Sequence, residues 1–437
     1  VGDTEINGLE YRFNYNNNVN TFANEYSAYL SMFGIDLKKS LKKQEYSEGK
    51  TWAQNFIEST TPQLVEVAIL EAEGKKSGFT MTEEQTKGID DYFTDLENYA
   101  KAEKLPVNVF VIRNYGTGMT VNDIRSFMER RIYSAAYQEK VVDEINVTDE
   151  QKQTYYNEHK SDFDTADIRS FTFKYTAPEA KTDEDGNTIE TTDESYKDEA
   201  RAKAEALLTA ATDEATFASA AFETLTAEEK ETYKDQDITL NNDVKSSSLG
   251  TEVAKWIFDS ARVEGDKTVI DENNAFNVIY FKRAGLKEYN AVSVRHILFT
   301  GETDEVKQKA EALLKQWQEG EATEESFTAL VKDNSEDTGS VENGGLYSDI
   351  GKGQMQVEFN NWIFDPVRKP GDTGIVKTSY GYHVMYFSGV GGPYWKIEAE
   401  NKVKSEEYTK YLDELKKSYT TVENKDIIVM SAENIIK

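Results

Sequence analysis

Side chains able to carry out acid–base chemistry near neutral pH are few in this chain of 437 residues, which holds three histidines and no cysteine. The lack of cysteine excludes disulfides, thiol nucleophiles and zinc sites with cysteine ligands. Three separated histidines do not supply a His-rich metal site either, so we expect no metal and no cofactor. His159 lies in a polar stretch typical of a solvated helix end, whereas His296 and His383 lie in strand-like runs. These two histidines are therefore the first candidates for chemistry.

An internal repeat surrounds the two candidate histidines. Three short segments recur at one offset of 106 residues: KAEALL at 203–208 and 309–314, WIFD at 256–259 and 362–365, and VIYF at 278–281 matching VMYF at 384–387. Because the matches keep the same order and register, we infer that a module is duplicated. Upstream, residues 168–173 correspond to 294–299 at an offset of 126, so the first copy carries about 20 extra residues. This acidic stretch, 177–198, is interpreted as a solvated insertion or hairpin.

The order of elements within each copy predicts a small mixed domain. In the second copy, residues 293–299 are strand-like, residues 306–319 place apolar side chains on one helical face, and residues 382–387 form a closing strand. An irregular polar segment and a short helix lie between them. A strand, then helices, then strands of a small antiparallel sheet is the pattern of the α+β class, which is the fold class we predict.

The second copy also carries motifs in a fixed order. They are RHIL at 295–298, SED at 335–337, GGL at 344–346, QMQ at 354–356 with Phe359, and GYH at 381–383. Their order and spacing, over about 100 residues from Val292 to Ser388, resembles the parvulin family of peptidyl-prolyl cis/trans isomerases. A single histidine in a strand is more often a core residue than a catalyst. Here, however, two of the chain's three histidines fall on both histidine positions of the family.

The resemblance implies a polar network around the histidine pair. His296 and His383 would lie on adjacent central strands and share hydrogen bonds that fix each other's tautomer. Asp337 would polarise the pair or lie close to the twisting carbonyl of the substrate. Thr378 holds a position that commonly bonds to this network, although an ordinary polar residue at the rim is an equal alternative. Because a carboxylate beside a partly buried histidine pair shifts the pKa of both, we predict a pH-dependent rate.

The resemblance also implies an apolar clamp for the substrate proline. An X–Pro bond rotates over a barrier of about 20 kcal/mol, because resonance stiffens the C–N bond, and no covalent step is needed to lower it. A catalyst need only favour the twisted amide. The residues implied to contact the proline ring are Leu346, Met355 and Phe359. Gln356 is implied to contact the substrate backbone, although, as for Thr378, an ordinary polar residue at the rim is an equal alternative.

Two departures from the family bear on substrates. Phosphate-directed parvulins carry a basic cluster after the first strand, whereas this chain has the acidic segment TGETDE at 300–305, so we expect unphosphorylated prolyl segments. The first copy keeps the frame but replaces the site, with Ser170 for His296 and Asn277 for His383. Leu249 and Val253 stand there for Met355 and Phe359. We interpret this copy as inactive, a binding platform or spacer.

Outside the repeats the chain is mainly helical. Apolar side chains from Val19 to Phe33 recur at helical spacing, and capping-box patterns begin at Thr82, Thr120 and Thr148. In the tail, residues 397–419 predict an amphipathic helix and residues 426–430 a short strand. So short a tail cannot bury a core alone, so we expect it to pack on the N-terminal helices. The predicted domains are 1–165 (helical chaperone domain), 166–290 (degenerate parvulin-like domain), 291–390 (isomerase domain) and 391–437 (returning tail).

Charge and hydropathy exclude several classes of protein. Lys and Arg number 50 against 80 Asp and Glu, a formal charge of −30, so we expect no nucleic-acid partner. An aromatic content of 12% indicates a globular protein rather than a disordered acidic chain. No apolar run is long enough to span a bilayer. The chain opens at Val1 without a signal-like segment, and we expect any export signal to have been removed and any lipid anchor to lie upstream.

Helices, parvulin modules and a returning tail together resemble the extracytoplasmic foldases of the PrsA and SurA kind. This resemblance implies a secreted or membrane-anchored peptidyl-prolyl isomerase and chaperone whose partners are unfolded exported proteins. The alternative is a holdase that binds unfolded chains without catalysis. A monomer and a homodimer are both compatible with the sequence.

Overall fold

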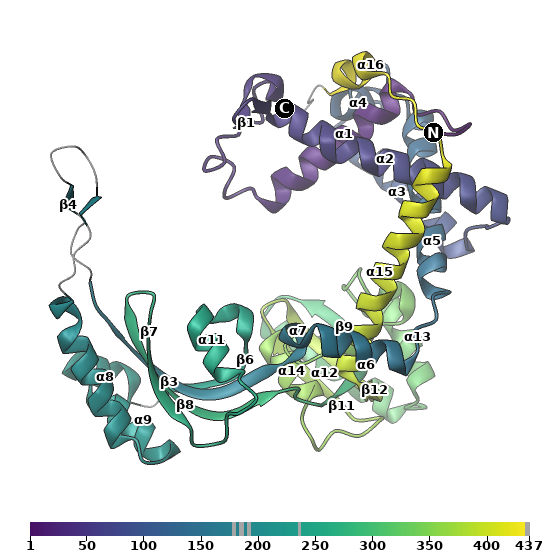
Figure 1. The fold of residues 1–437 in the computed structure, drawn as a ribbon. Helices are drawn as coiled ribbons and strands as arrows, with labels where there is room; N and C mark the ends of the chain where they lie inside the picture. Colours follow the sequence, from purple (N-terminus) through teal and green to yellow (C-terminus); the bar gives the residue numbers. More distant parts are fainter. Residues whose placement is uncertain (177–180, 183–187, 190–193, 235–236, 433–437) are drawn as a thin grey trace. The chain divides into compact units, whose positions relative to one another are not determined.

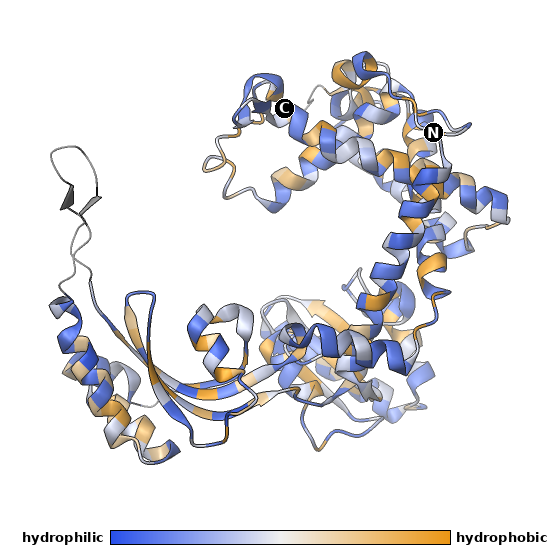
Figure 2. Ribbon diagram, viewed as in Figure 1, coloured by the Kyte–Doolittle hydropathy of each residue, from blue (hydrophilic) through white to orange (hydrophobic). Residues whose placement is uncertain are grey.

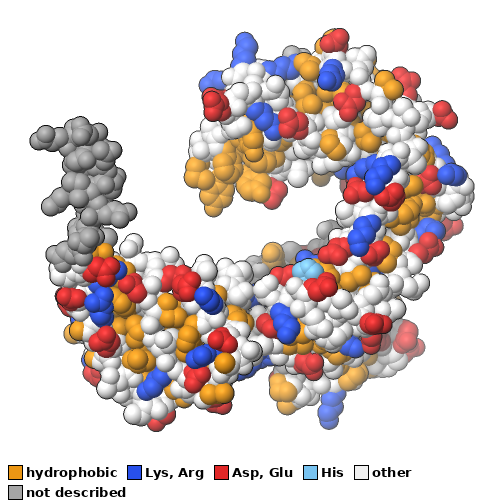
Figure 3. Space-filling model, viewed as in Figure 1, with side chains coloured by type: hydrophobic (Ala, Val, Ile, Leu, Met, Phe, Trp, Pro, Cys, Tyr) orange, Lys and Arg blue, Asp and Glu red, His pale blue; other side chains and the backbone are white. Residues whose placement is uncertain are grey.

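The structure is a computed structural model that describes residues 1–176, 181–182, 188–189, 194–234 and 237–432 (Figure 1). The chain divides into two compact units. The first contains Val1–Val147 and Lys402–Lys437, and the second contains Thr148–Asn401. Within the described ranges, every helix is too short or too polar to cross a membrane. Acidic and basic side chains are interspersed on the face seen in Figure 3.

The first unit is helical apart from one short hairpin. Its elements are α1 (Gly8–Glu25), η1 (Leu41–Lys43), β1 (Glu45–Ser47), β2 (Lys50–Thr51), α2 (Trp52–Ser77), α3 (Glu83–Ala102), α4 (Val107–Tyr115), α5 (Val121–Asp143), the later part of α15 (Tyr394–Ser418) and α16 (Lys425–Ser431). The predicted capping boxes at Thr82, Thr120 and Thr148 are confirmed, since each hydroxyl accepts from the backbone N–H three residues on and that residue's side chain accepts in return. These caps fix where α3, α5 and α6 (Asp149–Glu158) begin.

Only the first part of the segment from Val19 to Phe33, whose spacing predicts a helix, is helical. Helix α1 ends at Glu25, and turns follow as far as Gly34. The rings of Phe22, Tyr26 and Phe33 pack on one another at 4.9–6.0 Å, so the chain folds back into an aromatic cluster instead of continuing the helix, and Phe33 stays exposed. Spacing alone could not separate these two outcomes.

The C-terminal tail packs on the N-terminal helices. Ile428 and Ala432 join the apolar cluster of Tyr11 and Trp52, and the Tyr419 hydroxyl donates to Glu73 at 2.8 Å. The prediction of a strand at 426–430 is wrong, because these residues lie in α16. The Asn424 side chain caps that helix by accepting from the Ile427 N–H at 3.2 Å. Burial of one helical face against α1 therefore outweighs the β-propensity of an Ile-Ile-Val run.

The second unit holds two modules of the same design. After α6 and α7 (Lys160–Phe163), the first module contains β3 (Thr165–Lys174), β4 (Lys181–Thr182), β5 (Thr188–Ile189), η2 (Ser195–Lys197), α8 (Asp198–Ala210), α9 (Glu214–Glu223), α10 (Ala227–Tyr233), β6 (Leu240–Lys245), η3 (Ser246–Ser248), α11 (Thr251–Ile257), β7 (Lys267–Glu272) and β8 (Ala275–Gly285). The second contains β9 (Asn290–Thr300), α12 (Asp304–Glu319), α13 (Glu324–Asn334), η4 (Val341–Asn343), β10 (Leu346–Ile350), α14 (Val357–Ile363), β11 (Thr373–Thr378) and β12 (Gly381–Pro393).

Both modules are antiparallel four-stranded sheets with the same strand order. The orders are β6-β3-β8-β7 and β10-β9-β12-β11, and β8 and β12 start 106 residues apart, as the sequence repeat requires. Hydrophobic residues run along the strands of both sheets (Figure 2). In the second module, one face of the sheet packs with α12 and α13 and the other with α14. The predicted duplication and the α+β class are therefore confirmed.

The segments that flank the modules pack on one another. Lys152 pairs with Glu400 at 2.6 Å, Lys396 pairs with Asp149 at 2.9 Å, and all four residues belong to the second compact unit. The compact units thus divide after residues 147 and 401, whereas the sequence-based domain limits of 165 and 390 stay predictions. In the predicted insertion at 177–198, β4 pairs with β5, and residues 177–180, 183–187 and 190–193 lie outside the described residues.

Candidate active site

The register of two central strands brings the histidines together. His296 of β9 lies opposite Met385, and His383 of β12 lies opposite Leu298. Because side chains alternate between the faces of a sheet, both imidazoles project from the same face as diagonal neighbours. Their ring centroids are 5.2 Å apart, and both side chains are buried. The antiparallel pairing of β9 with β12 therefore builds the centre of the site.

The two imidazoles belong to a chain of hydrogen bonds with one consistent set of protons. Thr378 Oγ1 lies 2.8 Å from His383 Nε2, the two Nδ1 atoms are 3.0 Å apart, and His296 Nε2 lies 2.7 Å from Asp337 Oδ2. A carboxylate only accepts, so His296 donates from Nε2 and its Nδ1 accepts. His383 then donates from Nδ1 and accepts at Nε2 from the Thr378 hydroxyl. Each ring thus holds the other in one tautomer.

Asp337 is the acceptor at the end of this chain. Its Oδ2 also accepts from the Ser340 hydroxyl at 2.5 Å and the Tyr347 hydroxyl at 3.0 Å, while Oδ1 accepts from the Gly339 N–H at 3.2 Å. The loop that carries it is tied to β9, because Ser335 Oγ accepts from the Leu298 N–H at 3.2 Å. The carboxylate is therefore fixed in direction rather than free to swing.

Burial and these bonds set the charges of the site. Burial lowers the pKa of His296, against the opposing effect of the Asp337 carboxylate. Burial and the neighbouring His296 lower the pKa of His383 to about 4. Burial by itself raises the pKa of Asp337, but the hydrogen bonds from Ser340, His296 and Tyr347 outweigh it and lower that pKa to about 2. At neutral pH the site therefore holds two neutral imidazoles and one carboxylate.

Aromatic and apolar side chains lie around the imidazoles. The Phe359 ring of α14 meets both histidines edge-on, with centroids 5.7 Å from His296 and 5.4 Å from His383. Met355 is half-buried in the apolar cluster that contains Phe359, and the Tyr347 ring lies 5.3 Å from His296. Gln356 is exposed at the N-cap of α14. The structure thus brings Phe359 and Met355 to this face of the sheet.

Leu346 is not brought into this group. It lies opposite Arg295 in the register of β10 with β9, and Arg295 and His296 point to opposite faces. Tyr347, opposite Val294, takes the place predicted for Leu346. The sequence contains a signal for this, because Leu346 and Tyr347 are neighbours in a strand and must therefore point to opposite faces of the sheet. Ser340, three residues after Asp337, is the other site residue that the sequence analysis missed.

The first module has different side chains at the corresponding positions. The Ser170 hydroxyl accepts from Asn241 Nδ2 at 3.0 Å, and Asn277 Oδ1 accepts from the Thr172 hydroxyl at 3.0 Å. Leu249 and Val253 pack in an apolar cluster with Ile168. His159, outside both modules, ends α6 with its ring stacked on Tyr155 at 4.1 Å. The first module thus has neutral side chains, Ser170 and Asn277, at the positions where the second module has the ionisable pair His296 and His383.

Comparisons with known proteins point to the second module. The family model for the PPIC-type PPIASE domain matches residues 280–389. Foldase protein PrsA 1 of Listeria monocytogenes serotype 4b (strain F2365) is 32% identical over 133 residues, covering 27% of this chain and 42% of that protein. Foldase protein PrsA of Latilactobacillus sakei subsp. sakei (strain 23K) is 25% identical over 215 residues, covering 45% and 67%. The chain thus spans less than half the length of the Listeria relative.

Among solved structures, PrsA from Bacillus subtilis also matches this chain and is 18% identical, with 70% of this chain and 91% of that chain covered and a TM-score of 0.24. The matched residues 280–389 contain both histidines, Asp337 and Phe359. This part of the chain is therefore a domain of the PPIC-type, or parvulin-type, peptidyl-prolyl isomerase family.

Proposed function

We propose that the chain is a peptidyl-prolyl cis/trans isomerase and foldase that assists the folding of exported proteins. The observation that carries this proposal is the hydrogen-bonded chain from Thr378 through His383 and His296 to Asp337, with the Phe359 ring against both imidazoles. Buried polar groups that are fully bonded and face an apolar wall suit a substrate that is itself a proline ring beside a carbonyl.

The reaction asks for stabilisation of a twisted amide rather than for bond-making. Twisting removes the resonance that places negative charge on the carbonyl oxygen, so the planar amide carries the more negative oxygen. A carboxylate near that oxygen raises the energy of the planar state more than that of the twisted state. Asp337, held as an anion by a pKa of about 2, is suited to this effect. Phe359 and Met355 would hold the proline ring while the carbonyl turns.

The substrates we propose are unphosphorylated X–Pro bonds. Support comes from the acidic segment after β9, in which Glu302 pairs with Lys377 at 2.8 Å and so neutralises a cation near the site. Arg295 pairs with Glu324 at 2.9 Å on the other face of the sheet. A phosphate dianion would meet carboxylates here rather than free cations. Unfolded exported proteins as partners, and an extracytoplasmic location, belong to the same proposal and rest on the resemblance to foldases.

A non-catalytic holdase is the second candidate. The first module favours it, because that module keeps the sheet and helices while its site positions carry Ser170 and Asn277. A duplicated fold without the ionisable network is better suited to contact than to catalysis. The two candidate functions predict different effects of substitutions at His296 and Asp337 on the rate of cis/trans exchange.

The deciding experiment measures cis/trans exchange of a proline peptide by NMR for the full chain and for His296→Ala and Asp337→Ala. Isomerase function predicts a rate lowered by about a hundredfold or more in both variants, on the scale of catalytic groups removed from a preorganised site. Ser170→Ala, at the matching position of the first module, is the control and should keep the wild-type rate. Equal rates in all four proteins, with suppression of client aggregation intact, would leave only the holdase.

A further inference from the structure

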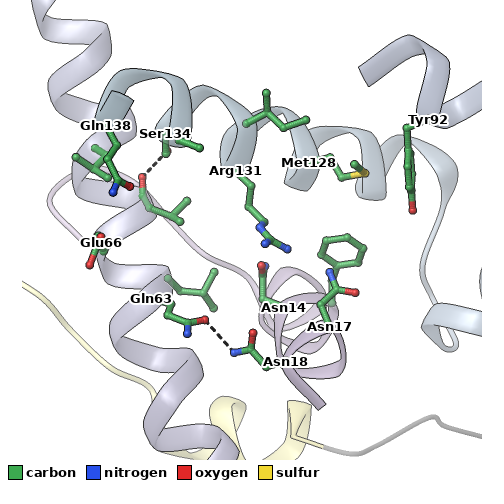
Figure 4. A pocket seen from close by; sticks show the side chains of 16 residues that line it. Asn14, Asn17, Asn18, Gln63, Glu66, Tyr92, Met128, Arg131, Ser134 and Gln138 are labelled. Atoms are coloured by element: carbon green, nitrogen blue, oxygen red, sulfur yellow. Dashed lines mark hydrogen bonds between the residues drawn. The ribbon is translucent and has the colours of Figure 1, made fainter. Parts of the chain in front are cut away.

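A cavity lies in the first unit, among helices α1, α2, α3 and α5 (Figure 4). It measures about 620 Å³. Apolar walls come from Phe13, Leu64, Tyr92 and Met128. A cavity of this size, with apolar walls and a few polar groups, has the make-up of a ligand site. The proline machinery lies in the other unit and makes no use of it.

The polar lining of this cavity is made largely of side-chain amides. They are Asn14, Asn17, Asn18, Gln63 and Gln138. Asn18 donates to Gln63 Oε1 at 2.9 Å (Figure 4), and Asn14 donates to the Glu10 carbonyl at 2.9 Å, so part of the lining is held in place. Each amide offers both a donor and an acceptor, as a peptide group does. Such a lining can bond to the backbone of a polypeptide whatever its sequence.

One cation, Arg131 of α5, points into the cavity (Figure 4). Among the described residues it forms neither an ion pair nor a hydrogen bond. Arg12 donates to the Thr117 carbonyl, and the remaining arginines pair with carboxylates: Arg113, Arg125, Arg130, Arg169, Arg201, Arg262, Arg283, Arg295 and Arg368. In a chain of net charge −30, a guanidinium that bonds to no other described residue stands out.

The acid that also lines the cavity does not neutralise Arg131. Glu66 of α2 pairs instead with Lys416 of α15 at 3.5 Å. Guanidinium groups bind carboxylates through two parallel N–H bonds, and these charge-assisted bonds are about twice as strong as neutral ones. The cavity therefore combines a carboxylate-binding group with amides that suit a peptide backbone.

We propose that this cavity binds a carboxylate-bearing segment of an unfolded polypeptide. Arg131 takes the carboxylate, the amides bond to the backbone, and the apolar wall takes a neighbouring side chain. The carboxylate comes from the chain's C-terminus or from an Asp or Glu side chain, and the two sources share this chemistry. The inference deepens the foldase proposal by naming what the helical unit selects in its clients.

The test measures binding of short, unstructured, proline-free peptides of one sequence to the full chain by anisotropy of an uncharged dye. The peptides carry a free or an amidated C-terminus, each with either Glu or Gln at one internal position. We expect Arg131→Gln to lower the affinity for the carboxylate-bearing peptides about tenfold and to leave the affinity for the uncharged peptide unchanged. A loss confined to the free C-terminus, or extending to the internal Glu, identifies the source of the carboxylate.

Two further variants keep the test decisive. Ala135→Glu places a carboxylate one helical turn from Arg131, where it pairs with the guanidinium. This variant keeps Arg131 and should still weaken binding of the carboxylate-bearing peptides to the same extent. Arg113→Gln removes the same charge from α4, outside the cavity, and should leave all four affinities unchanged. Equal affinity for charged and uncharged peptides, or a carboxylate preference that survives both Arg131→Gln and Ala135→Glu, overturns the proposal.

The same proteins are assayed for exchange of a proline peptide. Because the cavity and the histidine pair lie in different compact units, Arg131→Gln should keep the wild-type isomerase rate. Loss of carboxylate binding with a normal isomerase rate supports the cavity independently. A wild type that binds carboxylate peptides but does not isomerise proline would overturn the proposed function and leave the cavity standing.

Discussion

Asp337 is the residue on which the polar network converges, since its Oδ2 accepts from His296, Ser340 and Tyr347. Three donors on one oxygen keep the carboxylate charged and pointing toward the imidazoles. The hydroxyl of Tyr347 is the donor most easily removed without leaving a cavity. The contribution of the network to catalysis can therefore be tested one bond at a time.

We predict that Tyr347→Phe raises the pKa of Asp337 toward its usual value, because one donor to the carboxylate is lost. Loss of one hydrogen bond of about 1 kcal/mol corresponds to a rate about fivefold lower. Carboxyl titration by NMR and proline-peptide exchange measure the two effects. An unchanged titration would show that the hydroxyl does not act on Asp337.

The sequence predicts a pH-dependent rate, and the structure predicts where the change occurs. Because the pKa of His383 is lowered to about 4, this imidazole stays neutral from neutral pH down to about pH 5. We expect the rate to be constant at and above neutral pH and to fall as His383 protonates, since a second N–H would face the Thr378 hydroxyl. A rate profile through this range, at constant ionic strength, checks the prediction.

The same shift predicts how stability depends on pH. The unfolded chain protonates His383 near pH 6.5 and the folded chain only near 4, so between these values the unfolded state binds more protons and stability falls as pH falls. The gap corresponds to about 3 kcal/mol of unfolding free energy. His383→Asn introduces the residue type that the first module has at the matching position, Asn277. It should remove this contribution to the pH dependence of the unfolding free energy, measured by denaturant unfolding. An equal slope in the variant contradicts it.

At the scale of elements, the turn before β10 aligns that strand with β9. Gly345 has φ 74°, and its carbonyl accepts from the His296 N–H at 2.9 Å. A Cβ there would lie 2.4 Å from the His296 carbonyl oxygen, which is backbone and cannot move aside cheaply. The strand that carries His296 and the loop after Asp337 therefore depend on this glycine for their close approach.

We predict that Gly345→Ala destabilises the protein by about 3 kcal/mol and also lowers the isomerase rate, because both the left-handed backbone and the clash oppose it. Gly353→Ala is the matched control. Its φ is 81°, but no heavy atom lies within 4 Å of a Cβ there, so only the backbone strain of about 1 kcal/mol applies. Equal losses of unfolding free energy in the two variants would rule out the clash.

At the scale of the whole molecule, the helical unit is built from both ends of the chain. Ile428 and Ala432 of the C-terminal region pack with Tyr11 and Trp52 from the N-terminal region. The histidine pair belongs to the other compact unit. Damage to the tail should therefore change the stability of one unit and leave the chemistry of the other intact.

We predict that Ile428→Ala lowers the unfolding free energy of the helical unit by about 2 kcal/mol, since a partly buried apolar side chain is lost from its core. Met430→Ala, in the same helix but 71% exposed, should have little effect. Proline-peptide exchange should match wild type in both. A lower rate in Ile428→Ala, measured where the protein is fully folded, would show that the units are coupled.

The sequence by itself determined the duplication and the α+β class and indicated His296, His383 and Asp337 as site residues, because repeats, periodicity and motif order can be read directly along the chain. Only the tertiary structure decided that Tyr347 rather than Leu346 faces the imidazoles, that Ser340 bonds to Asp337, and that residues 425–431 form a helix. These outcomes depend on strand register and on packing between distant segments. A shift of one residue in register moves a side chain to the opposite face of a sheet, and burial against another helix can override local β-propensity.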